Sequence, residues 1–151
     1  MSADAKVAKE LVETLKDGEK GFASAADKLR DSDHPEAAAT FQRLSEQRAG
    51  FARDIVAMGH EYGDDVDKGG TATAALHRGW LSLKDALTGD DASGVIGAAV
   101  TGEDHAVSEY EKALDEDDLS DGFRALVQQQ HTAVVAARDE VKALQNLSQD
   151  D

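Results

Sequence analysis

Three polar residues stand where an apolar residue is expected in the sequence. Arg48, Glu103 and Gln130 each fall on a stripe of apolar residues that recurs every three or four positions, and such a stripe is the core face of a helix. Glu19 and His131 flank stripes of the same kind. Because a buried charge without a partner costs several kcal/mol, these five residues must satisfy one another or bind something else.

The same residues are predicted to lie at similar heights along the molecule. Two turns are expected near residues 33 and 117, and Glu19, Arg48, Glu103 and His131 all lie about 14 or 15 residues from the nearer turn. At about 1.5 Å of rise per helical residue, the side chains of each hairpin would differ in height by only a few ångströms. If the two hairpins are aligned, the five polar residues form one layer.

Two interpretations of this layer follow from the residue types. In the first the layer is structural: Arg48 bridges Glu19 and Glu103, while Gln130 and His131 complete the hydrogen bonds and fix the helix register. In the second, Glu19, Glu103 and His131 are metal ligands for iron, manganese or zinc, as in other helical bundles. The residue types and spacing alone leave both interpretations open.

The pattern of a complete di-metal centre is not met. That pattern needs Glu-x-x-His on two helices and a further Glu on each of the other two. Glu103 is followed by Ala106 and Glu46 by Ala49, so both lack the histidine, whereas His131 is preceded by Gln128 in place of a glutamate. The sequence therefore favours a structural layer, with a degenerate metal site as the alternative.

An all-α, single-domain protein covering residues 1–151 is expected to position these residues. The chain contains one proline and few β-branched runs, a composition typical of helical proteins. Asp33 or His34 is expected to cap the second helix, and Asp118 the last. The predicted helices are Asp4–Leu29, Glu36–Glu61, a short Thr71–Leu87, Val95–Asp115, and a last helix ending near Leu147.

The connections predict the topology of a four-helix bundle. Short turns make the first two and the last two long helices antiparallel hairpins, whereas some thirty residues separate the hairpins. A connection of that length can run along the whole bundle, which predicts the up-down-down-up arrangement of ferritin-like folds. The short helix in this crossover carries His77 and Trp80, which are expected to dock on the bundle or to make a subunit contact.

Composition excludes several classes of partner. Thirty-one acidic and sixteen basic residues give a formal charge of −15, which disfavours nucleic acid and anionic lipid. No stretch approaches the roughly 20 apolar residues of a membrane span, and the absence of cysteine fits a cytoplasmic protein. No phosphate loop or nucleophile motif is present, so the sequence favours a non-catalytic protein without a defined cofactor.

Four segments of the chain resemble a bacterial family of unknown function within the ferritin-like superfamily. They are LVETLKDGEKGF at 11–22, RAGF at 48–51, LHRGWLSLKDALTG at 76–89 and GEDHAVSEYEKAL at 102–114. The resemblance implies a ferritin-like fold and a bacterial, cytoplasmic protein associated with stress, and it implies no established activity. It also implies a homo-oligomer, a dimer or larger, while a partner of another kind stays unidentified.

Overall fold

The computed structural model describes residues 3–30, 34–59 and 92–149, and these residues form four helices and no strands. The helices are α1 (Ala3–Arg30), α2 (Pro35–Gly59), α4 (Ala92–Leu114) and α5 (Asp121–Gln149). The all-α prediction is confirmed for these residues. The predicted short helix Thr71–Leu87, with His77 and Trp80, lies outside them.

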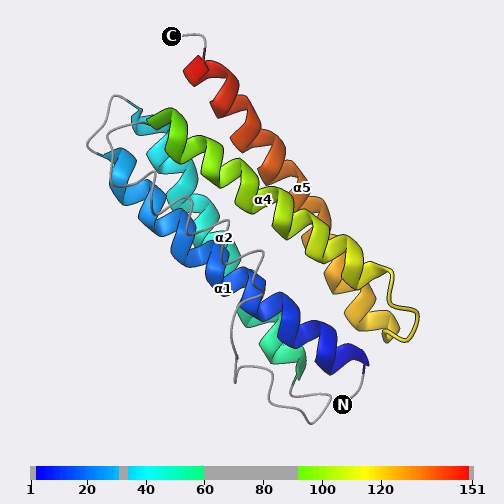
Figure 1. Ribbon diagram of the computed structural model, residues 1–151. Coiled ribbons are helices and arrows are strands. Elements are labelled where there is room, and N and C mark those ends of the chain that lie inside the picture. Colours follow the sequence, from blue (N-terminus) through cyan, green and yellow to red (C-terminus); the bar gives the residue numbers. More distant parts are fainter. Residues whose placement is uncertain (1–2, 31–33, 60–91, 150–151) are drawn as a thin grey trace.

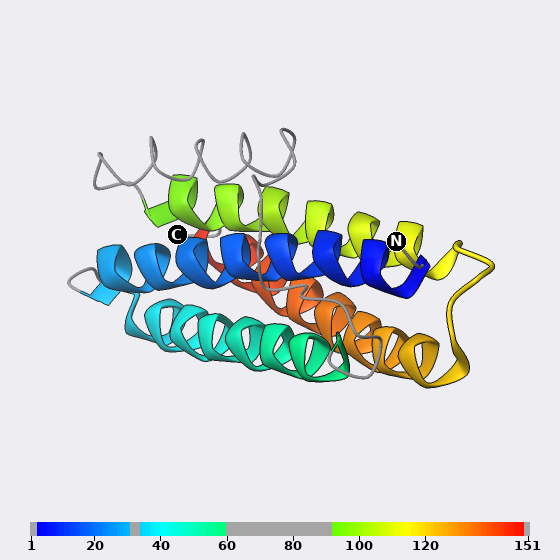
Figure 2. The same ribbon diagram turned by 90° about the horizontal axis from the view of Figure 1, so that it is seen from below.

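The four helices pack side by side along most of their length (Figures 1 and 2). α1 packs against α2 and α4, and α5 packs against α4 and α2, so α2 and α4 face each other across a diagonal of the bundle. In both views α1 and α5 run in one direction, and α2 and α4 run in the opposite direction. A side chain that reaches from α2 to α4 must therefore cross the centre of the bundle.

Each helix buries one stripe, as its apolar period predicts. On α1 the stripe includes Leu11, Leu15, Gly18 and Phe22, all of which are buried. Asp4 in the first turn and Arg30 in the last turn have the charges that complement the helix dipole. The helix is therefore favoured both by burial of one face and by the charges at its ends.

The predicted cap of the last helix, Asp118, is wrong. Ser120, not Asp118, precedes the helix: its Oγ accepts a hydrogen bond from Phe123 N at 3.4 Å, and its carbonyl accepts one from Arg124 N at 2.9 Å. Asp4 Oδ1 accepts a hydrogen bond from Ser120 N at 2.9 Å, so the cap is also tied to the start of α1. Asp118 lies two residues too early to reach the first free N–H groups of the helix.

At the start of α2, the carbonyl of His34 accepts a hydrogen bond from Ala38 N at 3.2 Å. His34 thus holds the position before the first helical turn, in agreement with one of the two predicted caps. Pro35 follows as the first helical residue, where its missing N–H is not needed. Asp33, the other predicted cap, lies outside the described residues.

The apolar core consists of two clusters, one toward each end of the bundle. One lies toward the end where α1 begins, and it includes Leu11, Leu15, Ile55, Tyr110, Phe123 and Val127. The other lies toward the end where α1 finishes, and it includes Phe22, Leu29, Phe41, Leu44, Ile96 and Val141. Arg48 and Glu103 belong to neither cluster, although both are buried. They fall between the two in each helix sequence, so a charged layer divides the core.

Candidate functional site

The centre of the bundle holds an ion pair between Arg48 of α2 and Glu103 of α4. The two terminal guanidinium nitrogens of Arg48 each donate a hydrogen bond of 2.6 Å to a different carboxylate oxygen of Glu103. The side chains are 1% and 0% exposed. This two-pronged arrangement is the strongest that an arginine can make with a carboxylate, and it joins the two helices that are diagonal to each other.

The remaining surface of the Arg48 guanidinium is also in contact with protein groups. Its Nε donates a hydrogen bond to Gln47 Oε1 at 3.2 Å. Its central carbon lies 5.2 Å from the ring centre of Phe22, within the range of a cation–π contact. Phe22 in turn stacks on Phe41 with 5.6 Å between ring centres. Arg48 therefore has its charge neutralised by Glu103 and one planar face covered by an aromatic ring.

A second group of buried polar atoms surrounds Gln130. Its side-chain oxygen accepts a hydrogen bond from the Tyr110 hydroxyl at 2.7 Å, and its side-chain nitrogen donates one to the carbonyl of Phe51 at 3.2 Å. Gln130 and Tyr110 are 1% and 0% exposed. Because these bonds connect α2, α4 and α5, the polar residue on the α5 stripe is satisfied within the protein.

Burial raises the pKa of the Tyr110 hydroxyl far above its ordinary value of 10. The nearby Arg48 charge lowers this pKa and the Glu103 charge raises it, but desolvation is the largest cause. The group therefore stays neutral in the folded protein at pH values where it would ionise in the unfolded chain. The free energy of unfolding therefore depends on pH through the ionisation of this hydroxyl.

We expect the protein to lose stability above about pH 10 in a way that depends on Tyr110. The pKa of Tyr110 is higher in the folded protein than in the unfolded chain. The contribution of this hydroxyl to the free energy of unfolding is therefore fully present below the unfolded pKa and declines as the pH rises above it. The free energy of unfolding should fall by up to about 1.4 kcal/mol per pH unit from this group. Urea unfolding measured from pH 8 to 11 tests this, with Tyr110→Phe as the control that should lose this part of the slope. Equal slopes for both proteins would contradict the prediction.

Glu19 is not part of the buried ion pair. Gly18 occupies the core-facing position of α1 beside Arg48, and Glu19, the next residue, is only half-buried. Its main-chain carbonyl accepts a hydrogen bond from Ser45 Oγ at 2.8 Å. The expectation that Arg48 bridges two carboxylates is thus corrected to one carboxylate, because Gly18 and not Glu19 faces Arg48 from α1.

His131 lies on the seam between α4 and α5 and takes no part in the Gln130 hydrogen bonds. Its Nε2 is 3.7 Å from a carboxylate oxygen of Glu111, a residue that is 63% exposed on its side chain. One residue along a helix turns the side chain by about 100°, so a neighbour of Gln130 cannot share its direction. The structure therefore brings together Arg48 and Glu103 and buries Gln130 nearby, but it leaves Glu19 and His131 outside the layer.

The three predicted metal ligands are not gathered into one site. Among the described residues, no three His, Cys, Asp or Glu side chains lie where they could hold a metal ion together. Glu103 also has both oxygens within 2.6 Å of a guanidinium nitrogen. A cation at that carboxylate would have to displace Arg48 and would leave a positive charge buried beside it.

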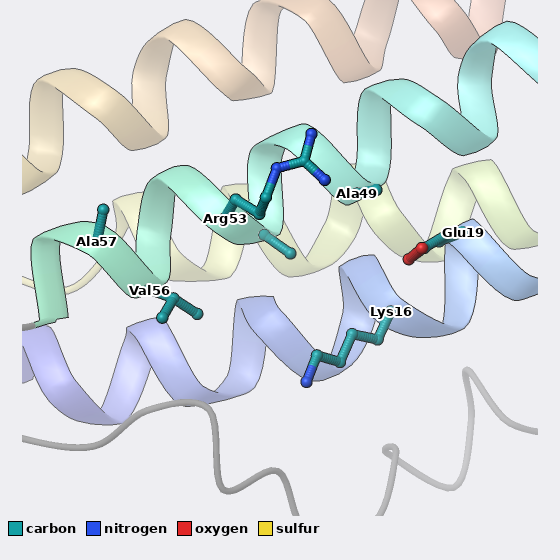
Figure 3. Close-up of a pocket in the computed structure, with 7 residues that line it drawn as sticks. Lys16, Glu19, Ala49, Arg53, Val56 and Ala57 are labelled. Carbon is teal, nitrogen blue, oxygen red and sulfur yellow. The ribbon is translucent and has the colours of Figure 1, made fainter.

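A groove that the sequence did not predict lies on the outer side of the α1–α2 hairpin (Figure 3). Its volume is about 450 Å³. Lys16 and Glu19 come from α1, and small or apolar residues of α2 together with Arg53 form the opposite wall. The available signal was the series of alanines along one flank of the core stripe of α2, of which Ala52 is itself buried. The complete lining is Lys16, Glu19, Ala49, Ala52, Arg53, Val56 and Ala57.

A family model described as a domain of unknown function, DUF2383, matches residues 5–116. The chain belongs to this family. No curated protein matches the chain. The expected resemblance to a family of unknown function is confirmed at this level, and the family assigns no activity.

The DUF2383 match includes Arg48, Glu103 and every residue that lines the groove, and it ends before α5 begins. Both partners of the central ion pair therefore lie within the family domain. Gln130 and His131 lie beyond it. Within residues 3–30, 34–59 and 92–149, no helix has the combined length and apolar character needed to cross a lipid bilayer.

Proposed function

We propose that this chain is a non-catalytic four-helix-bundle protein that acts by associating with further copies of itself. The bundle is proposed to be ferritin-like, with up-down-down-up topology, and the protein to be cytoplasmic. The buried polar layer serves to fix the register of the helices. The binding surface lies on the outside of the bundle.

The central ion pair is the observation that carries this proposal. Other proteins of this architecture place metal or cofactor sites among inward-facing side chains. Here the equivalent space is taken by a guanidinium and a carboxylate that are joined through both carboxylate oxygens, with Phe22 against the guanidinium. Such a centre specifies how the helices align but offers no free ligand or proton acceptor to a substrate.

The helix directions support the proposed topology. α2 and α4 run in the same direction (Figure 1), although they follow one another in the described part of the chain. Two consecutive long helices can be parallel only when the chain returns along the bundle between them. The 32 residues from 60 to 91 are sufficient for that return.

Measurement of molecular mass, together with metal analysis of the untagged full chain, tests the proposal. We expect light scattering after gel filtration to give a multiple of the 16.0 kDa chain mass, and elemental analysis to give far less than one metal ion per chain. Anaerobic addition of iron followed by oxygen should leave the ultraviolet spectrum unchanged.

Two results would overturn the proposal. A mass of one chain at every concentration tested would remove self-association. One tightly held metal ion per chain, lost on Glu103→Gln substitution while the helical content is kept, would instead establish a metal protein.

A further inference from the structure

The groove between α1 and α2 has cations at its edge in a strongly acidic protein. Lys16 and Arg53 line it together with one carboxylate, that of Glu19, while the chain as a whole carries −15. Arg53 is exposed, and within the described residues its guanidinium makes no hydrogen bond or ion pair. The two cations outnumber the single carboxylate of the lining, so the groove repels an acidic molecule less than the overall charge of the chain implies.

The α2 wall of the groove continues into an outward-facing stripe in which an acidic and a basic residue lie at equal distances from one point. Arg53 lies three residues after Gly50, and Glu46 lies three residues before Ala49. When two copies of one helix cross antiparallel about a two-fold axis, residues at equal distances from the crossing point face each other. A crossing between Ala49 and Gly50 would place each Arg53 opposite a Glu46.

The residues at that crossing point allow two helices to approach closely. Ala49 and Gly50 are half-buried, and neither has a bulky side chain. A glycine inside a helix costs roughly 0.5–1 kcal/mol relative to alanine. Among the described residues nothing requires glycine at position 50, because a Cβ built there would meet only the end of the Arg53 side chain, at 3.7 Å. Close packing against a helix of another molecule would explain a glycine at this position.

We propose that a second copy of this chain docks on this face, with the two α2 helices antiparallel across the α1–α2 grooves. The two-fold axis passes near Ala49 and Gly50, and Arg53 of each copy pairs with Glu46 of the other. This inference rests on the proposed self-association and names its surface. Within the described part of one copy, Glu46 accepts a single hydrogen bond, from Gln42 at 3.4 Å, so its carboxylate can also accept one from an arginine.

The net charge does not prevent this contact. At physiological ionic strength the interactions between exposed charges are screened beyond about 8 Å, so the acidic surfaces outside the contact repel weakly. Inside the contact the charges alternate: each copy supplies both a carboxylate and a guanidinium. Two symmetry-related pairs form for each dimer, and the apolar residues Ala49 and Ala57 lie beside them.

The first test is charge reversal at Arg53, measured as the dimer dissociation constant by sedimentation velocity. Arg53→Glu should raise that constant about tenfold or more, because both pairs become like-charge contacts. Lys112→Glu is the matched control, since it makes the same change of net charge at an exposed site in the last turn of α4 and should leave the constant unchanged. The double variant Glu46→Arg with Arg53→Glu restores opposite charges across the axis and should recover most of the affinity.

The second test separates docking from folding. Gly50→Leu should keep or raise the thermal midpoint of unfolding, because leucine favours helix and the Cβ at this position meets only the flexible end of Arg53. It should nevertheless weaken dimerisation by about tenfold or more through steric conflict. A dimer that is insensitive to Arg53→Glu and to Gly50→Leu would overturn this surface while leaving the proposed self-association intact. A wild-type chain that is always monomeric would overturn both.

Discussion

Glu103→Ala is expected to lower the free energy of unfolding by about 3–5 kcal/mol. The substitution removes the counter-charge and both acceptors of the terminal nitrogens of Arg48, a side chain that is 1% exposed and lies between the two apolar clusters of the core. A cation left there is buried without a counter-charge, and unfolding returns it to water. Urea unfolding followed by circular dichroism gives the free energy, and a loss of this size is a large part of the stability of a small domain.

The Arg43–Glu140 pair provides the matched control for this prediction. It also joins two helices, α2 and α5, at 2.5 Å, but its side chains are 55% and 44% exposed. Glu140→Ala should therefore cost no more than about 1 kcal/mol, because water replaces the lost partner. Equal losses for Glu103→Ala and Glu140→Ala would mean that the central pair is solvated in solution.

Removing both partners of the central pair should be far less harmful than removing one. In Arg48→Met with Glu103→Leu, apolar side chains of similar size occupy the layer and no charge is left unpaired. Replacements of this kind are often neutral or stabilising by about 1–4 kcal/mol. If the double variant is as unstable as Glu103→Ala, packing around the layer, and not its charge, determines the loss.

The apolar period predicted the central pair for a physical reason. Arg48 and Glu103 lie on their own core stripes and at matching distances from the hairpin turns, so direction and height were both determined. Glu19 and His131 had the correct height but the wrong direction. Each lies one residue after a buried position, Gly18 or Gln130, and the resulting rotation of about 100° carries the side chain out of the layer.

Other features depended on choices that the sequence leaves open. Asp118 and Ser120 are both good caps, and only the path of the turn decides which one reaches Phe123 N. The Arg124 side chain helps fix that path by donating hydrogen bonds to the carbonyls of Leu114 and Glu116. The groove was missed because it depends on how far apart α1 and α2 lie, a property that the periodicity of either helix does not contain.

Phe22→Ala is expected to lower the free energy of unfolding by about 3–5 kcal/mol, and Phe22→Leu by less. Phe22 is 0% exposed and contacts both the Phe41 ring and the Arg48 guanidinium. Alanine leaves a cavity beside a buried charge, whereas leucine fills most of the space and removes only the aromatic face. Urea unfolding of the two variants separates the volume of the side chain from its interaction with the cation.

A double-mutant cycle isolates that interaction. In the background of Arg48→Met with Glu103→Leu no cation faces the ring, so Phe22→Leu should cost about 0.5–2 kcal/mol less there than in the wild type. Phe123→Leu is the control, because Phe123 is equally buried but belongs to the other apolar cluster and should cost the same in both backgrounds. If Phe22→Leu also costs the same in both, the ring contributes only apolar surface, and the Arg48 charge is stabilised by Glu103 and Gln47 alone.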